Sequence, residues 1–236
     1  MKSLLNKISS NQAVTRFLNG DRGLMINDIL SLSYLICASF YKKKQNYSIV
    51  APNLYVAQNI YEQISAIIGE ENCLLYPVDE IFYHTNYSYS KEMLAQRLYV
   101  MDKCLDGQNR ILITHVNAVQ RILPSPKIYL KNTIVLRKNE RYVLNEIINK
   151  LNEMSFLRVN KVDQSLQYAL RGDILDIFPI NAEKPLRIEF FDDEIESIRE
   201  FDIGSQISSN NLEEVKIFPA TDLLIDKDLN EGIKRI

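Results

Sequence analysis

The first half of the chain alternates short apolar runs with longer stretches in which apolar residues recur at helical spacing. Three short aliphatic runs predict buried strands: 47–52, 73–76 and 110–115. Three longer stretches predict helices at 29–44, 54–68 and 91–105. A fourth, short helix is predicted after the last strand and ends near Leu123. Asn53 and Ser90 stand at positions suited to helix N-caps. Such alternation predicts an α/β layer with a mostly parallel sheet.

The pattern changes at Pro124-Ser125-Pro126, and an α+β module is expected beyond it. One helix is predicted at 143–154, among strands predicted at 133–136, 157–162, 168–178, 186–191 and 197–202. The apolar segment Val215–Pro219 is expected to return to the first domain, before a polar tail that suggests a fragment of a longer protein. We therefore expect an α/β domain at 1–125, an inserted α+β domain at 126–210 and a return segment at 211–236.

The strand Leu186–Phe191 alternates apolar and polar residues, and so has one buried face and one exposed face. On this pattern Phe190 faces the core, whereas Arg187 and Phe191 are neighbours on the exposed face. Arg171 lies on the preceding strand, where apolar and polar residues alternate less regularly. An exposed arginine beside a large aromatic ring is typical of a protein-binding hot spot. The alternative is a lone exposed ring, which is common on protein surfaces.

Four acidic residues follow the two phenylalanines: Asp192, Asp193, Glu194 and Glu196. Paired carboxylates can bind a metal ion or act as acid and base. Consecutive residues in a turn point apart, however, and no histidine, lysine or second acidic cluster accompanies them. The sequence favours a simple turn, which aspartate readily forms.

The segment Gly23–Leu30 precedes a helix, where a phosphate-binding loop would lie. Asp28, Ile29 and Leu30 occupy the places of the second glycine, the lysine and the hydroxyl residue of that motif. The segment lacks the charge that binds phosphate, so we expect no ATP binding and a helix capped by Asn27 or Asp28.

A third candidate is a group of tyrosines, Tyr83, Tyr87 and Tyr89, because interleaved aromatic rings can stack on single-stranded bases. No lysine or arginine lies among them. A loop packed on its own domain is the better interpretation.

Composition narrows the remaining possibilities. A net charge of -2 argues against a free-standing duplex-binding domain. The three cysteines Cys37, Cys73 and Cys104 are scattered in apolar surroundings, so we expect buried thiols in a reducing compartment. The two histidines have no second ligand nearby, which disfavours zinc. The N-terminus lacks the apolar core of a signal peptide, and the longest apolar run, 29–41, is too short to cross a bilayer, so we expect a cytoplasmic protein.

Several segments together resemble a known family. LRGDILDIFP and PLRIEFFDDEIESIREFDIGSQIS are similar to the UvrB-homology module of bacterial transcription-repair coupling factors, and UvrB itself has a related pattern. APNLYVAQNIYEQI and ITHVNAVQRILP resemble other segments of that module. UvrB has an intact phosphate loop and a long DNA-clamping hairpin, and this chain has neither, so the likeness is to the coupling factors.

The resemblance implies a degenerate helicase-like (RecA-like) α/β domain with an inserted α+β domain that binds UvrA. It carries the family's contact residues onto Arg171, Arg187 and Phe191. It further implies a non-catalytic module, without cofactor or metal, that recruits UvrA to stalled RNA polymerase in nucleotide excision repair. ATP, magnesium, DNA and the polymerase would be bound by other parts of a full-length translocase. The alternative is a UvrB-like, ATP-dependent DNA-handling repair enzyme.

Overall fold

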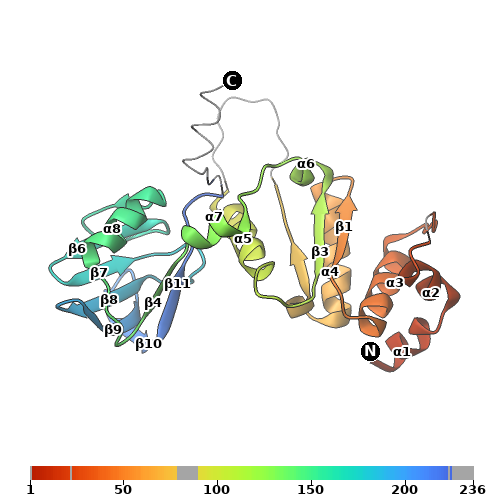
Figure 1. Ribbon diagram of the computed structural model, residues 1–236, viewed down its shortest axis with the longest axis horizontal. Coiled ribbons are helices and arrows are strands. Elements are labelled where there is room, and N and C mark those ends of the chain that lie inside the picture. The colour runs from red at the N-terminus through yellow and green to blue at the C-terminus, as the bar shows by residue number, and fades with distance from the viewer. Residues whose placement is uncertain (1, 22, 79–89, 223, 225–236) are drawn as a thin grey trace, which may run out of the picture. The chain divides into compact units, whose positions relative to one another are not determined.

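The computed structural model describes residues 2–21, 23–78, 90–222 and 224. Contacts within the chain divide it into two compact units, residues 1–121 and 122–236. Figure 1 labels most of the helices and strands of both units.

The first unit is built on a three-stranded parallel sheet with the strand order β1-β3-β2 (Figure 1). The strands are β1 (Tyr47–Ala51), β2 (Cys73–Leu75) and β3 (Ile111–His115). Helices α3 (Ile29–Lys42) and α4 (Leu54–Ile68) share one apolar core with this sheet. The predicted α/β layer with a parallel sheet is therefore confirmed.

Local capping chemistry sets where the helices of this unit begin. The side chains of Asp28, Asn53 and Ser90 each accept a hydrogen bond from a backbone N–H in the first turn of the helix that follows. Helix α5 (Lys91–Lys103) and helix α6 (Val116–Val119) end earlier than predicted.

Two short helices at the N-terminus were not predicted. They are α1 (Lys2–Ser9) and α2 (Gln12–Leu18), and the 3₁₀ turn η1 (Glu70–Asn72) is a further addition. Leu5 and Val14 are buried in the same core as α3. Each helix is shorter than the length that forms alone in water, so packing on α3 stabilises it.

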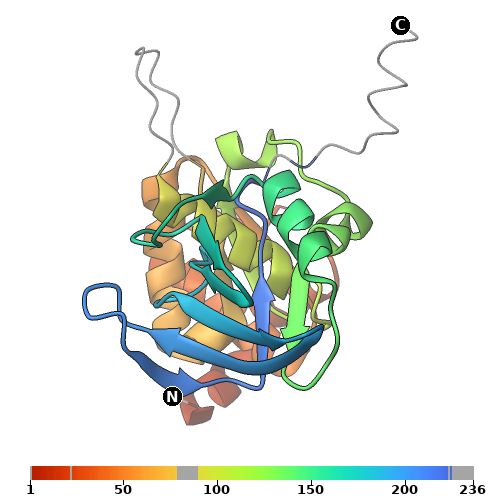
Figure 2. The same cartoon turned by 90° about the vertical axis from the view of Figure 1, so that its left-hand side faces the viewer.

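The second unit is dominated by a six-stranded sheet with the order β10-β9-β8-β7-β6-β5. The strands are β5 (Leu157–Arg158), β6 (Gln167–Arg171), β7 (Ile174–Ile177), β8 (Leu186–Phe191), β9 (Glu194–Phe201) and β10 (Ser208–Asn211). All neighbours are antiparallel except β5 and β6. Figure 2 faces this unit and shows β8 and β9 running side by side. Helix α8 (Leu144–Glu153) buries three aliphatic residues in the core with one face of the sheet.

The stretch expected as one strand, 168–178, is a hairpin of β6 and β7. Gly172 turns the chain with a φ of 58°, a left-handed value that glycine adopts at no steric cost. Helix α7 (Pro126–Lys131) and the polar strand β10 were not predicted.

The expectation that Val215–Pro219 returns to the first domain is not what the structure shows. Strand β11 (Glu214–Ile217) pairs with β4 (Ile134–Arg137) in a two-stranded antiparallel sheet of the second unit. Val215 and Ile217 belong to the same apolar core as the buried residues of α8, and they pair with Leu136 and Ile134 of β4. Apolar alternation identified the strand but could not identify its partner.

Candidate protein-binding surface

The β8–β9 hairpin presents one phenylalanine and buries the other. Phe191 is 77% exposed and Phe190 is 5% exposed, which confirms the alternation predicted for the strand. The turn consists of Asp192 and Asp193, with Asp192 at a φ of 60°. Glu194 already belongs to β9, where it pairs with Phe191. The predicted acidic turn is therefore confirmed for the two aspartates, and the two glutamates are strand residues.

The tip of this hairpin is held by a neighbouring loop. The backbone N–H of Tyr142 donates to the carbonyl of Asp193 at 2.7 Å, and the N–H of Ile195 donates to the carbonyl of Glu140 at 3.0 Å. The carbonyl of Ile195 in turn accepts from Asn139 at 2.8 Å. These bonds fix the chain at and after the turn, and on the other side Phe191 is paired with Glu194 in the β8–β9 ladder, so the exposed ring stands on an ordered backbone.

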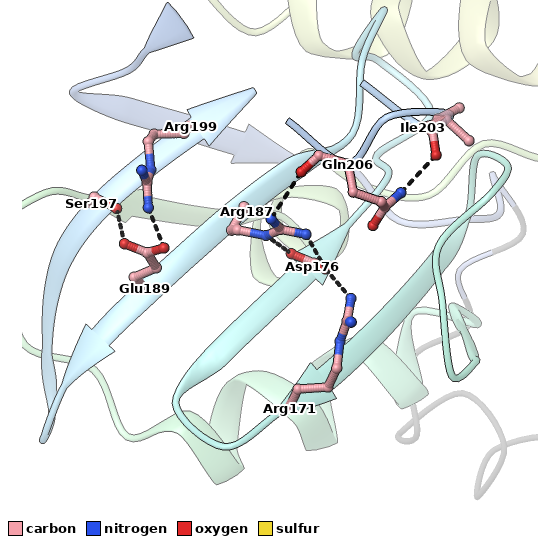
Figure 3. A network of polar contacts seen from close by, with 8 residues as sticks. All are labelled: Arg171, Asp176, Arg187, Glu189, Ser197, Arg199, Ile203 and Gln206. Carbon is pink, nitrogen blue, oxygen red and sulfur yellow. Dashed lines mark hydrogen bonds and ion pairs between the residues drawn. The ribbon is translucent and has the colours of Figure 1, made fainter. Parts of the chain in front are cut away.

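Arg187 shares the face of Phe191, as predicted, but its side chain is only 18% exposed. Its Nε donates to Oδ1 of Asp176 at 2.7 Å, and its Nη2 donates to Oδ2 at 2.9 Å (Figure 3). These bonds raise the pKa of Arg187 above its ordinary value, so the group stays charged. The guanidinium also lies 4.6 Å from the ring centroid of Phe201. Arg187 therefore lies on the predicted face but is not exposed there as expected, because its guanidinium is bound within its own chain.

Arg171 reaches the same carboxylate from β6. Its Nη2 donates to Oδ2 of Asp176 at 2.7 Å, and its side chain is 53% exposed (Figure 3). Asp176, which is 1% exposed, therefore binds two guanidinium groups. The three site residues named from the sequence lie on one face, but only the two arginines are joined by a common partner.

A second ion pair lies between Arg187 and Phe191 along this face. Glu189 pairs with Arg199 and accepts a hydrogen bond from the Ser197 hydroxyl at 2.9 Å (Figure 3). Asp176, Glu189 and Arg199 were not singled out from the sequence. One signal of this cluster was available in the sequence, namely an aspartate within the apolar run Ile174–Ile177. A buried acid needs a partner, so this aspartate indicates that a basic group lies nearby.

The remaining candidates from the sequence carry no comparable arrangement. Asp28 directs its carboxylate to the N–H of Ser31 at 2.7 Å, so the start of α3 is occupied by an acid. In the described part of the chain no three histidine, cysteine or acidic side chains come together as metal ligands. Tyr83, Tyr87 and Tyr89 lie outside the described residues.

Two general expectations can also be compared with the structure. Cys37 and Cys73 are buried, and desolvation raises the pKa of each to about 12, but Cys104 is exposed, contrary to prediction. Cys104 directly follows α5, where the helix reaches the surface. Among the described residues, no helix has both the length and the apolar character to span a bilayer.

Comparisons with known proteins add to this geometry. The family model described as UvrB interaction domain matches residues 134–223, a range that contains Arg171, Arg187 and Phe191. The transcription-repair-coupling factor of a Staphylococcus aureus strain is 30% identical over 200 residues, which are 85% of this chain and 17% of that protein. That of Bacillus subtilis is 31% identical over 177 residues, which are 75% of this chain and 15% of that protein. The chain thus spans less than a fifth of the length of these relatives.

Proposed function

This chain is a homologue of the transcription-repair-coupling factors and carries a UvrB interaction domain, and from that premise we propose that its second unit binds UvrA. In this proposal the chain is a non-catalytic binding module. It recruits UvrA to stalled RNA polymerase in transcription-coupled nucleotide excision repair, in the cytoplasm. Translocation on DNA, ATP hydrolysis and polymerase binding are assigned to other parts of a full-length protein.

The observation that carries the proposal is the exposed ring of Phe191 on the same sheet face as an arginine cluster, formed by Arg171 and Arg187 on the carboxylate of Asp176. A ring that is 77% exposed gains apolar burial when a partner covers it. The backbone beneath it is already fixed, so little ordering accompanies docking. Arg171 presents a half-exposed side chain on the same sheet face, and its guanidinium is suited to a carboxylate of the partner. Aromatic and arginine side chains are the residues that dominate binding energy at protein interfaces.

We propose no catalytic site for this chain, because of the way in which α3 begins. The helix that would follow a phosphate loop begins at Asp28, whose carboxylate accepts from Ser31. A negative charge there repels phosphate. We therefore assign no nucleotide, metal ion or other cofactor to this chain.

Isothermal titration of UvrA with the wild-type chain and with Phe191→Ala tests the proposal. Truncation of a central aromatic anchor costs about 2 kcal/mol or more, so the affinity should fall about thirtyfold. Tyr55→Ala is the matched control, since Tyr55 is a 71% exposed ring in the first unit. Wild-type affinity in Phe191→Ala, or equal losses in both variants, would overturn the site assignment.

A further inference from the structure

The arginine cluster contains an acid that a partner would not be expected to touch. Asp176 lies in the middle of β7, opposite Arg187 on β8, and is 1% exposed. Its two oxygens accept three hydrogen bonds of 2.7 to 2.9 Å, two from Arg187 and one from Arg171 (Figure 3). The cluster therefore carries two positive charges and one negative charge.

The two arginines are not equally available to a partner. Arg187 also donates from Nη1 to the carbonyl of Gln206 at 3.3 Å, so each of its nitrogens has an acceptor within the chain. Arg171 is half-exposed, and among the residues that the structure describes, Asp176 is its polar partner. The donors that remain open for a carboxylate thus belong mainly to Arg171.

We propose that Asp176 is a positioning residue, which holds Arg171 in the orientation that receives a single carboxylate of the docking partner, while Arg187 holds Asp176 through two hydrogen bonds. This inference rests on the proposed function. An arginine left free on the surface has many rotamers, and binding must select one of them at a cost in entropy. A buried carboxylate that already fixes the guanidinium reduces that cost before the partner arrives.

Positioning and simple electrostatics predict opposite results when the acid is neutralised. Asp176→Asn removes one negative charge from the face, so attraction of an acidic partner would rise if charge alone mattered. If Asp176 acts by fixing Arg171, the same change weakens binding. The expected loss is about three- to tenfold, the cost of ordering one long side chain.

The matched control is Glu189→Gln. Glu189 lies on the same face, where it pairs with Arg199 and accepts a hydrogen bond from Ser197, and it acts on Arg187 through its charge alone. Like Asp176→Asn, this change removes one negative charge and replaces a carboxylate by an amide of nearly the same size. We expect UvrA affinity to fall in Asp176→Asn and to stay level or rise in Glu189→Gln. Affinity in Asp176→Asn equal to or tighter than wild type would overturn the inference.

A double-variant comparison separates this inference from the proposed function. In an Arg171→Ala background, Asp176→Asn should cause no further loss, because its effect passes through Arg171. A further loss of similar size would show that Asp176 acts by another route. If Arg171→Ala itself binds UvrA like wild type, the proposed site is wrong, and the inference falls with it for that distinct reason.

A measurement on the wild-type chain keeps the inference testable if Asp176→Asn does not fold. Nitrogen-15 relaxation of the arginine Nε–H groups reports side-chain order. Arg141 is the internal reference, because it is 72% exposed and its closest ion pair is 3.7 Å long. We expect the Arg171 side chain to be clearly more ordered than that of Arg141. Equal mobility of the two would overturn the inference.

Discussion

Arg187→Ala should destabilise the second unit, because it removes two of the three donors that satisfy a buried carboxylate. Asp176 is 1% exposed and would keep only its bond to Arg171. Removing one partner of a buried ion pair costs about 3–5 kcal/mol. Arg187 is 18% exposed and one donor remains, so the expected loss in unfolding free energy is about 2–3 kcal/mol.

Urea unfolding followed by far-UV circular dichroism measures this loss, since the chain has no tryptophan. Amide hydrogen exchange in β7 and β8 reports the second unit by itself. Arg171→Ala is the control, and with a half-exposed side chain it should cost no more than about 1 kcal/mol. Replacing Asp176 by Leu together with Arg187 by Met should recover most of the loss, because no buried charge is then left without a partner. Equal stability of Arg187→Ala and Arg171→Ala would refute the reasoning.

Two further predictions concern the first unit. The side chain of Arg110 bonds to Asp106 and holds the pKa of that carboxyl at about 2 instead of 3.8. Because the pKa is lowered in the folded state, the ionised carboxyl stabilises the fold above pH 3.8, and this stabilisation is lost as the pH falls through about 2. Asp106→Asn should therefore lower the melting temperature at pH 7, with a difference that shrinks below pH 4, and a difference independent of pH would contradict this. Under native conditions a maleimide should label Cys104 alone, as mass spectrometry would show, because Cys37 and Cys73 are buried thiols. Equal labelling of all three would show that the first unit opens readily.

Local chemistry explains what could be predicted from the sequence. The caps Asn53 and Ser90 act on the next turn of chain, and the alternation around Phe190 and Phe191 depends on a single strand. The exposure of Phe191 could therefore be read directly from the sequence. The polar strand β10 has no such pattern, and α1 and α2 depend on packing against α3.

The state of Arg187 could not be predicted in this way. Alternation places its side chain on the outer face, but its exposure depends on Asp176, eleven residues earlier and on another strand. The same limit applies to β11, whose pairing with β4 joins residues that are far apart in the sequence. Because β7 and β8 pair, Arg187 binds Asp176 and is not exposed as expected. It thereby helps to hold the carboxylate that Arg171 also binds. The stability of Arg187 variants must therefore be measured before their binding is interpreted.

The footprint of UvrA on this chain tests the central claim most directly. Amide hydrogen exchange of the wild-type chain, measured with and without saturating UvrA, would locate the contact at the level of single strands. We predict slower exchange in β8, in the Asp192-Asp193 turn and in the β6–β7 turn beside Arg171, with the parallel sheet of the first unit unchanged. Protection confined to the first unit, or no protection at any UvrA concentration, would contradict the claim that the face of Arg171 and Phe191 is the binding surface.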